Sequence, residues 1–244
     1  MRILSPMTTA QPEPRDFVAA IVVAAGSGRR LGAAVNKVLL PLAGRAILRR
    51  SVEALCADPR VRSIRVVIRP DDEPEVLSAL GGGPFPDLRC VPGGTERADS
   101  VRRGLEATDP RAHLVLVHDA ARPLLPRHVL AAVIDAGFAQ GAAIPTVPVA
   151  DTLKRVADGV IGGTVDRSAL AAAQTPQAAR PAALRDAYAR WPTGAAPPTD
   201  EAQVLEHAGI RVAAVAGDPR NLKITTQADL ALAEFLCTRT EDTP

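Results

Sequence analysis

Short aliphatic runs alternate along the chain with longer stretches that are rich in alanine and leucine, from Phe17 onward. Runs of four to eight β-branched or aliphatic residues are typical of buried strands, and the longer stretches between them are typical of helices. This alternation predicts a mostly parallel α/β sheet covered by helices on both faces. The expected strands are 18–25, 64–68, 88–91, 114–118, 142–147 and 210–215, and the expected helices are 46–57, 96–107, 126–139, 181–190, 199–207 and 227–236.

Residues 149–170 break this alternation. Two short β-like runs flank Asp158 and Gly159, a pair that favours a tight hairpin turn, and no helical period is present. We expect this segment, with an outer limit of about 149–172, to leave the sheet as an arm. An isolated two-stranded hairpin is only marginally stable in water, so the arm is expected to pack against another subunit.

Composition narrows the classes of protein that the chain can represent. A length of 244 residues with 47% apolar content allows one large domain with a substantial core. The net charge is only +2 and aromatic residues make up 2%, so polynucleotide binding is disfavoured. Cys56, Cys90 and Cys237 lie far apart without metal-binding spacing, which favours a reducing cytoplasm over a disulfide framework or a zinc site.

Membrane insertion is not expected. No apolar run reaches the roughly 18 residues needed to span a bilayer. Residues 1–16 contain several prolines and lack the apolar region of a secretory signal, so we interpret them as a disordered leader of a cytoplasmic protein.

The loop that follows the first strand reads AAGSGRRLG, residues 24–32. Its glycines allow backbone N–H groups to approach an anion closely, and it stands at the carboxyl end of a strand, where open α/β sheets bind ligands. Two arginines lie in the loop and Lys37 follows it. The loop therefore predicts a phosphate site, although a Gly-x-Gly alone also fits an ordinary turn.

Two familiar phosphate loops fit this segment less well. The third glycine falls one residue late for the dinucleotide fingerprint, and no acidic residue ends a second strand about 20 residues later. A Walker A loop would end in Gly-Lys-Ser or Gly-Lys-Thr, which is absent here. The sequence therefore favours a phosphate loop of another kind.

Lysine is rare in this chain. Only Lys37, Lys154 and Lys223 are lysines, and the other 26 basic residues are arginines. A lysine ammonium is a compact, strongly hydrated point charge, unlike the planar fork of arginine. Two of the three lysines stand next to candidate phosphate loops, which suggests a functional use, with chance retention as the alternative.

The strand at 114–118 runs directly into His118, Asp119 and Arg122. This order places a carboxylate and a cation at the ligand edge of the sheet. His118 could serve as a general base, but a histidine at a strand end is more often a structural residue, and we expect that role here.

Taken together, these segments resemble the 2-C-methyl-D-erythritol 4-phosphate cytidylyltransferase family of the non-mevalonate isoprenoid pathway, over about residues 18–240. The resemblance implies a Rossmann-like nucleotidyltransferase fold with a protruding β-arm, and a cytidylyltransferase domain at 17–240. The segments that carry it are AAGSGRRLG (24–32), GGTERADSV (93–101), VLVHDAARP (115–123), DTLKR (151–155), TVDR (164–167), TPQ (175–177), TDEA (199–202) and NLKIT (221–225).

The activity implied by the resemblance joins CMP from CTP to 2-C-methyl-D-erythritol 4-phosphate and releases pyrophosphate. The acceptor phosphate would attack the α-phosphorus, with Mg²⁺ held mainly by CTP phosphates and water. Roughly six negative charges meet in such a site, so cations must offset their repulsion. The acceptor phosphate, with a second pKa of about 6, is already ionised, so positioning matters more than a general base.

The resemblance also implies residue roles. Arg30 and Lys37 would stabilise the pentacoordinate α-phosphate, while Lys223 and Arg167 would position the acceptor. The nucleotide-binding residues would be Ala24, Ala25, Gly26, Gly28, Gly94, Thr95, Ser100, Asp119 and Ala120, with Gly94, Thr95 and Ser100 reading the cytosine. Further acceptor contacts would come from Arg122, Thr152, Thr175 and Thr199. Arg167 and Thr152 would come from the arm of a neighbouring subunit, which implies a homodimer with two shared sites.

Asn36 and Val38 depart from the family pattern, which commonly has proline and glutamine on either side of the lysine. The departure leaves open what keeps the turn at Lys37 rigid.

In some bacteria the domain is fused to the cyclodiphosphate synthase of the same pathway, and we expect no second activity here.

Two other functions compete with this interpretation. A cytidylyltransferase for another polyol phosphate, such as ribitol 5-phosphate, would share the nucleotide half and differ at the acceptor. A catalytically silent nucleotide-binding protein could lose the cations, whereas this chain keeps Arg30, Lys37, Arg167 and Lys223.

Overall fold

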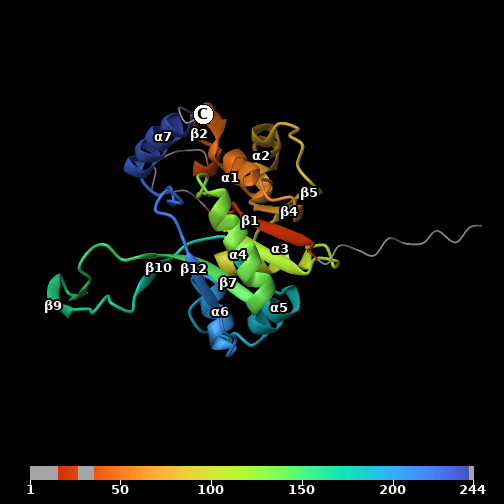
Figure 1. Ribbon diagram of the computed structural model, residues 1–244. Coiled ribbons are helices and arrows are strands. Elements are labelled where there is room, and N and C mark those ends of the chain that lie inside the picture. Colours follow the sequence, from red (N-terminus) through yellow and green to blue (C-terminus); the bar gives the residue numbers. More distant parts are fainter. Residues whose placement is uncertain (1–15, 27–35, 242–244) are drawn as a thin grey trace, which may run out of the picture.

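Eight strands form the main sheet of the computed structural model, which describes residues 16–26 and 36–241 (Figure 1). β1 lies in the middle, β4 and β5 follow on one side, and β6 flanks it on the other, all parallel. Beyond β6, the short strand β11 runs antiparallel to both β6 and β7. β7 also pairs antiparallel with β10 and parallel with β12. The strands are β1 (Val18–Val23), β4 (Val61–Ile68), β5 (Leu88–Pro92), β6 (Leu114–Asp119), β7 (Ala142–Pro148), β10 (Ala171–Ala173), β11 (Gln177–Ala179) and β12 (Ala213–Ala216).

Helices cover both faces of this sheet, so the predicted mostly parallel α/β architecture is confirmed. Val18, Ala20 and Val22 of β1 belong to one core cluster, and Ile21 belongs to the cluster on the opposite face. The helices on the first face are α1 (Ile47–Leu55), α2 (Glu73–Leu80) and α4 (Arg127–Gln140). Those on the second face are α3 (Arg97–Glu106), α5 (Pro181–Ala189) and α6 (Glu201–His207).

Close contact between α3 and the sheet depends on Gly104. A Cβ atom at this position would lie 2.6 Å from Cγ2 of Ile21 and 2.9 Å from Cγ2 of Val67. Such distances are far below ordinary carbon contact, so a larger residue would push α3 away from the sheet. Gly104 thereby allows the later part of α3 to pack closely on β1 and β4.

A third apolar cluster lies apart from the two faces of the sheet. Helix α7 (Gln227–Glu241) packs Leu230 and Cys237 against Leu42 and Ile47, which belong to or follow the small hairpin of β2 (Pro41–Leu42) and β3 (Arg45–Ala46). Ile224, just before α7, is part of the same cluster and is fully buried. This packing fixes the segment that carries Lys223.

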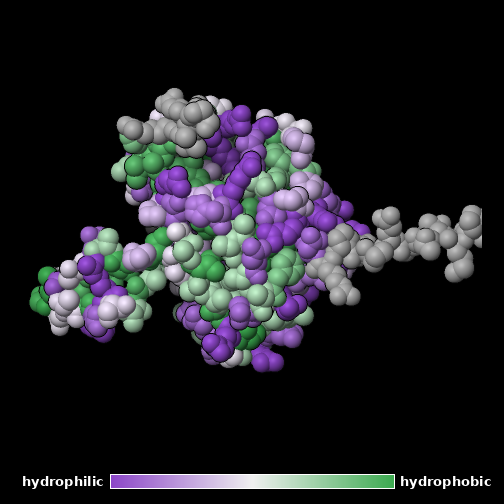
Figure 2. All heavy atoms as spheres, viewed as in Figure 1, coloured by the Kyte–Doolittle hydropathy of each residue, from purple (hydrophilic) through white to green (hydrophobic). Residues whose placement is uncertain are grey.

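The arm is a two-stranded hairpin of β8 (Lys154–Ala157) and β9 (Val160–Thr164), which projects from the body (Figure 1). Asp158 and Gly159 have φ values of 51° and 77°, as the tight turn inferred from this pair requires. Apolar side chains gather near its tip (Figure 2), where Val156, Val160 and Ile161 are more than 60% exposed.

The structure contains several short elements beyond the sequence-based expectation, among them the hairpin of β2 and β3, helix α2, and strands β10 and β11. Helix α2 was not predicted, because only Val76 and Leu80 of its eight residues are buried and the apolar period is weak. Strands β10 and β11 have three residues each and are too short to give a strand pattern. Since β10 pairs with β7, residues 171–172 belong to the sheet and not to the arm.

No helix in the described parts of the chain is both long and apolar enough to cross a membrane. The expected leader at 1–16 falls outside the described residues except for Asp16.

Candidate active site

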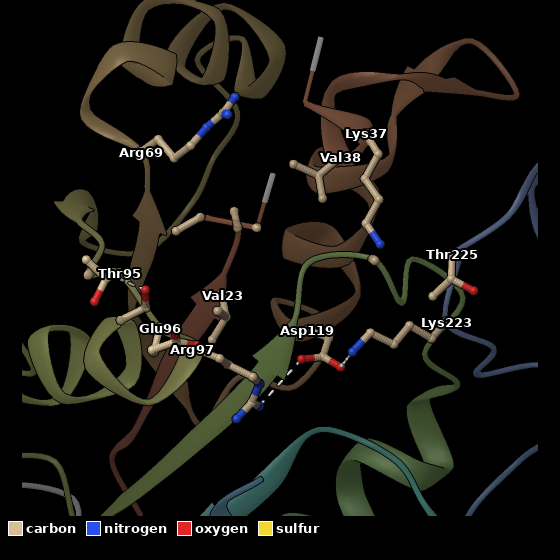
Figure 3. Close-up of a pocket in the computed structure, with 16 residues that line it drawn as sticks. Val23, Lys37, Val38, Arg69, Thr95, Glu96, Arg97, Asp119, Lys223 and Thr225 are labelled. Atoms are coloured by element: carbon tan, nitrogen blue, oxygen red, sulfur yellow. Dashed lines mark hydrogen bonds and ion pairs between the residues drawn. The ribbon is translucent and has the colours of Figure 1, made fainter. Parts of the chain in front are cut away.

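A cavity of about 730 Å³ opens at the carboxyl ends of the central parallel strands (Figure 3). Six segments of the chain line it: the end of β1, the turn at Lys37 and Val38, the residue after β4, the loop between β5 and α3, the end of β6, and the segment before α7. Such an edge is where open α/β sheets bind ligands. The lining residues are Val23, Ala24, Ala25, Gly26, Lys37, Val38, Arg69, Gly94, Thr95, Glu96, Arg97, Ser100, Asp119, Ala121, Lys223 and Thr225.

Most of the residues assigned to the nucleotide and to catalysis meet in this cavity. They are Ala24, Ala25, Gly26, Lys37, Gly94, Thr95, Ser100, Asp119 and Lys223. Two other assigned residues, Gly28 and Arg30, lie outside the described residues. Local sequence motifs therefore pointed to segments that the fold brings together.

The loop between β5 and α3 is shaped by close backbone contacts. A Cβ atom at Gly93 would lie 2.6 Å from Cβ of Ala25, and one at Gly94 would lie 2.2 Å from Cβ of Asp99. Both positions therefore exclude side chains. The backbone N–H of Gly94 donates a hydrogen bond to Oγ of Ser100 (3.1 Å), which fixes the loop against the first turn of α3.

Asp119 is the anionic centre of the cavity and only 7% exposed. Lys223 Nζ lies 2.8 Å from its Oδ2, Arg97 Nη2 lies 3.5 Å from its Oδ1, and Arg122 Nε lies 3.7 Å from Oδ2. Burial alone raises the pKa of the carboxyl, but the surrounding cations outweigh it and hold the pKa of Asp119 well below its usual range. Asp119 is therefore ionised at neutral pH.

Arg97 is a cavity residue that the motifs did not single out. Its Nη1 and Nη2 bind Oε1 and Oε2 of Glu201 at 2.8 and 3.0 Å, a bidentate pair. Glu201 is 1% exposed and also accepts a hydrogen bond from the hydroxyl of Tyr188 (3.1 Å). Burial lowers the pKa of Arg97, but Glu201 and Asp119 raise it more, so the guanidinium stays charged.

The segments GGTERADSV and TDEA contain Arg97 and Glu201, but nothing local indicated that the two side chains pair. Arg69, Glu96 and Thr225 also line the cavity without having been assigned a role.

Lys37 and Lys223 enter the cavity from opposite ends of the chain (Figure 3). Lys37 begins the 3-10 helix η2 (Lys37–Leu39), and its Nζ donates a hydrogen bond to the carbonyl oxygen of Ile224 at 3.0 Å. Because Ile224 follows Lys223 directly, the two ammonium groups belong to one connected arrangement.

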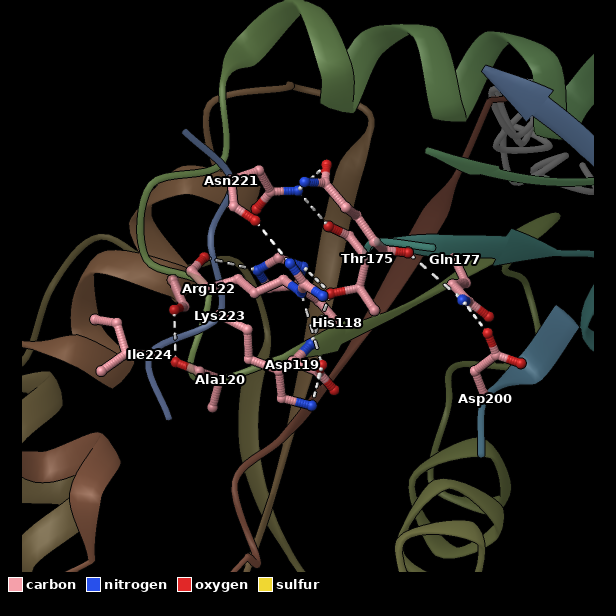
Figure 4. A network of polar contacts seen from close by, with 12 residues as sticks. His118, Asp119, Ala120, Arg122, Thr175, Gln177, Asp200, Asn221, Lys223 and Ile224 are labelled. Atoms are coloured by element: carbon pink, nitrogen blue, oxygen red, sulfur yellow. Dashed lines mark hydrogen bonds and ion pairs between the residues drawn. The ribbon is translucent and has the colours of Figure 1, made fainter. Parts of the chain in front are cut away.

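His118 is fully buried in a polar network (Figure 4) and does not line the cavity. Its Nε2 is 3.1 Å from the carbonyl oxygen of Arg122, which can only accept, so we assign the ring proton to Nε2. Nδ1 then accepts from Thr175 Oγ1 (3.0 Å), and that oxygen accepts from the N–H of Asp119 (3.1 Å). Burial lowers the pKa of His118 to about 4, so it is neutral and supports the fold.

The same network fastens the Lys223 segment to the end of β6. Arg122 Nη1 donates to the carbonyl oxygen of Asn221 (2.7 Å), and Asn221 Nδ2 donates to that of Thr175 (2.8 Å). Arg122 and Thr175 therefore face this interior network and do not line the cavity, and Ala120 is fully buried. The acceptor contacts implied for Arg122 and Thr175 remain predictions.

The remaining assigned residues lie elsewhere. Thr199 donates through Oγ1 to Oε1 of Gln203 (3.1 Å) at the start of α6 and does not line the cavity. Thr152 is exposed in the arm. Arg167 binds the carbonyl oxygens of Val149 and Ala150 and lines a separate cavity of about 590 Å³ at the base of the arm.

The fold and the site define an α/β nucleotide-binding protein whose cavity suits a ligand rich in phosphate. Its volume falls within the usual range for small-molecule sites, and Lys37, Arg97 and Lys223 all line it, the last two paired with the ionised Asp119.

The chain belongs to the 2-C-methyl-D-erythritol 4-phosphate cytidylyltransferase family, whose sequence model matches residues 18–239. It is 46% identical to a protein of that name from Saccharopolyspora erythraea, over 89% of this chain and 97% of the relative. It is 47% identical to a bifunctional IspD/IspF enzyme from Rhodospirillum rubrum, over 90% of this chain and 56% of the relative. The chain thus spans about half the length of the bifunctional relatives that it matches.

Solved structures show the same fold. A 4-diphosphocytidyl-2C-methyl-D-erythritol synthase from Anaerococcus prevotii superposes with a TM-score of 0.81 at 30% identity, covering 92% of this chain and all of that one. A 2-C-methyl-D-erythritol 4-phosphate cytidylyltransferase from Thermus thermophilus gives a TM-score of 0.75 at 33% identity, covering 91% and 99%.

Proposed function

We propose that this chain transfers the CMP group of CTP to 2-C-methyl-D-erythritol 4-phosphate and releases pyrophosphate. The observation that carries the proposal is that Lys37, Arg97 and Lys223 line one cavity at the sheet edge, where Arg97 and Lys223 pair with Asp119. Two relatives that this chain covers almost completely, from Saccharopolyspora erythraea and Thermus thermophilus, bear the name of this activity, which supports it further.

The reaction exchanges one phosphorus–oxygen bond for another. An oxygen of the acceptor phosphate attacks the α-phosphorus of CTP, and the bond from that phosphorus to the bridging oxygen of pyrophosphate breaks. The attacking oxygen carries no proton near neutral pH, since the second pKa of a phosphomonoester is about 6. The protein therefore needs to position the reactants and offset charge more than to remove a proton.

The described residues divide these tasks. In this proposal the loop from Gly94 to Ser100 binds the base, and the N–H groups after β1 bind the triphosphate. Lys37 offsets the negative charge that develops at the α-phosphorus, together with Arg30, which lies outside the described residues. Lys223, which pairs with Asp119 here, would exchange part of that contact for the acceptor phosphate.

Mg²⁺ is part of the proposal. No group of three or more His, Cys, Asp or Glu side chains able to hold a metal occurs among the described residues, but Asp119 and Glu96 face the cavity. Mg²⁺ commonly binds through one or two carboxylates and substrate phosphates, so the cavity fits an ion that arrives with CTP. When bound, such an ion neutralises phosphate charge. EDTA should abolish turnover and added Mg²⁺ should restore it.

A homodimer in the cytoplasm completes the proposal. All three cysteines are described and none forms a disulfide, which suits a reducing compartment. In a dimer that shares its arms, Arg167 would reach the acceptor phosphate bound to the neighbouring subunit. Its separation from the main cavity within one chain is consistent with that arrangement.

Subunit complementation tests the shared site. If Arg167→Ala and Lys37→Ala are each inactive, mixed dimers should contain one site with both residues intact. Activity should return to about a quarter of the wild-type level after random exchange, because half of the dimers are mixed and each has one good site. Subunit exchange without any return of activity would show that Arg167 serves its own subunit.

The decisive experiment for the activity is pyrophosphate release with CTP, UTP and ATP against a panel of sugar and polyol phosphates that includes ribitol 5-phosphate. CTP should exceed UTP by about 10⁴, since a site built for hydrogen bonds rejects an analogue that lacks them. Comparable turnover with UTP would overturn the base-loop assignment, and preference for another acceptor would reassign the substrate. Absence of turnover with every pair would support a silent nucleotide-binding protein.

A further inference from the structure

We propose that Asn36 is a positioning residue that holds the turn of Lys37 in place through Asp72 and Ala24. The inference rests on the proposed function, because it concerns the placement of a cation that acts on the α-phosphate. Asn36 directly precedes Lys37 and is the N-cap of the 3-10 helix η2, so it can restrain the backbone from which that lysine extends.

The amide of Asn36 joins three parts of the chain. Its Nδ2 donates to the carbonyl oxygen of Ala24 at 3.0 Å and to Oδ2 of Asp72 at 2.8 Å. Its Oδ1 accepts from the backbone N–H of Val38 at 3.4 Å. The side chain is 3% exposed, so these bonds form in a site that water barely reaches. Asn36 thereby connects the loop after β1, the start of η2 and the segment after β4.

Asp72 is itself held rigidly. Arg69 Nε and Nη2 bind Oδ2 and Oδ1 of Asp72 at 2.9 and 2.7 Å, in a bidentate ion pair. These hydrogen bonds hold the pKa of Asp72 below its usual range, so the carboxylate stays charged as an acceptor for Asn36. Arg69 also lines the cavity, so the chain of bonds begins and ends at the site.

The contacts place this restraint where it affects catalysis. Ala24 belongs to the proposed phosphate loop, and Lys37 directly follows Asn36. The Asn36 amide therefore connects the loop to the turn that carries Lys37. A misplacement of about 1 Å in such a group can lower the rate about 10²-fold. The φ angle of Asn36 is −57°, within the range that a proline ring imposes. We infer that side-chain bonds here do what ring rigidity does at a proline.

The test compares kcat and the KM for CTP in variants of the full chain. Asn36→Ala should lower kcat about 10- to 100-fold with little change in KM, and Asp72→Ala should act similarly. The double variant should lose little more than either single variant, because both residues belong to one chain of bonds. Asp71→Ala is the matched control, since Asp71 is the exposed neighbour of Asp72 in the 3-10 helix η3 (Pro70–Asp72).

Asn36→Pro separates positioning from general stability. It removes the amide but fixes φ, so it should recover a large part of the kcat lost in Asn36→Ala. Hydrogen exchange over residues 36–40 supplies a readout apart from activity: it should be faster in Asn36→Ala than in the wild type and slower again in Asn36→Pro. If Asn36→Ala does not fold, Asn36→Pro and Asp72→Ala still carry the comparison.

The outcomes distinguish this inference from the proposed function. If the wild-type enzyme is active and the Asn36→Ala variant has the same kcat, the inference alone is overturned. The same holds if Asp72→Ala behaves like Asp71→Ala, or if the losses in the double variant multiply. A wild-type chain that shows no turnover in the substrate panel would overturn the proposed function, and the inference with it.

Discussion

Asp119 in the cavity has three cations within 3.7 Å and is almost fully buried, whereas every residue of β8 and β9 in the arm is exposed. The cavity is thus an internally compensated arrangement of charges within one chain. The arm has a well-defined turn but no core of its own, and two strands alone are marginal in water. The contrast teaches that defects in the cavity should appear as lost catalysis or stability, and defects in the arm as lost association.

The largest expected effect is a loss of kcat on replacing Lys37, which the same replacement of Lys154 should not cause. Lys37→Ala should lower kcat about 10² to 10³-fold with a smaller change in the KM for CTP, because its charge matters most as negative charge develops at the α-phosphate. Lys154→Ala, on β8, is the matched control and should keep its kcat within a few-fold. Steady-state kinetics measure both. Equal kcat values for Lys37→Ala and the wild type would remove Lys37 from catalysis.

The buried ion pair gives the next largest effect. Glu201→Ala should lower the free energy of unfolding by about 2 kcal/mol, since it removes the bidentate partner of the partly buried Arg97 guanidinium and the acceptor of the Tyr188 hydroxyl. The double variant Arg97→Met with Glu201→Leu should regain stability without regaining kcat, because apolar residues can fill the site but cannot hold a charge. Urea unfolding and kinetics on both variants check this. Arg155→Ala in the exposed arm should leave the unfolding midpoint unchanged, and a similar loss there would remove the contrast.

The buried histidine predicts a pH dependence of stability. Folding lowers the pKa of His118 from about 6.5 to about 4, so between these values the unfolded chain binds more protons than the folded one. Stability should therefore be fully present above pH 6.5 and fall as the pH drops towards 4. Linkage gives a loss of about 2 kcal/mol from pH 7 to pH 5.

Urea unfolding at these two pH values measures the loss. His118→Gln should remove most of it, whereas His128→Gln, which alters a largely exposed ring, should retain it. An unchanged pH dependence in His118→Gln would show that other groups cause it.

The smallest effect concerns the arm. Replacing the exposed Val160 and Ile161 by serine should weaken dimerisation about tenfold or more, since each side chain would lose apolar burial at the interface. Sedimentation velocity over a concentration series measures this, with circular dichroism to confirm that the body stays folded. Leu77→Ser is the matched control, because Leu77 is an exposed apolar residue on α2. Equal dissociation constants for both variants would exclude the arm tip from the interface.

The arrangement of strands and helices followed largely from local pattern. Alternating apolar runs predicted β1, β4, β5, β6 and β7, and the turn at Asp158 and Gly159 predicted the hairpin, because periodicity and turn preference depend on neighbours in sequence. Helix α2 and the three-residue strands β10 and β11 were not predicted, since too few of their residues show an apolar pattern. Motifs also pointed to Lys37, Asp119 and Lys223, which line the cavity. For Asp119 this follows from its place at the end of β6, because the carboxyl ends of parallel strands meet at one edge.

Sequence by itself therefore determined the fold class and pointed to Lys37, Asp119 and Lys223, which line the cavity. Only the tertiary structure decided that Arg97 pairs with Glu201, 104 residues away, and that Asn36 binds Asp72, 36 residues away. It also turned Arg122 and Thr175 towards the interior network. These outcomes depend on which side chains the crossovers bring face to face, and buried polar groups then take whichever partners lie within reach, because leaving them unpaired is costly.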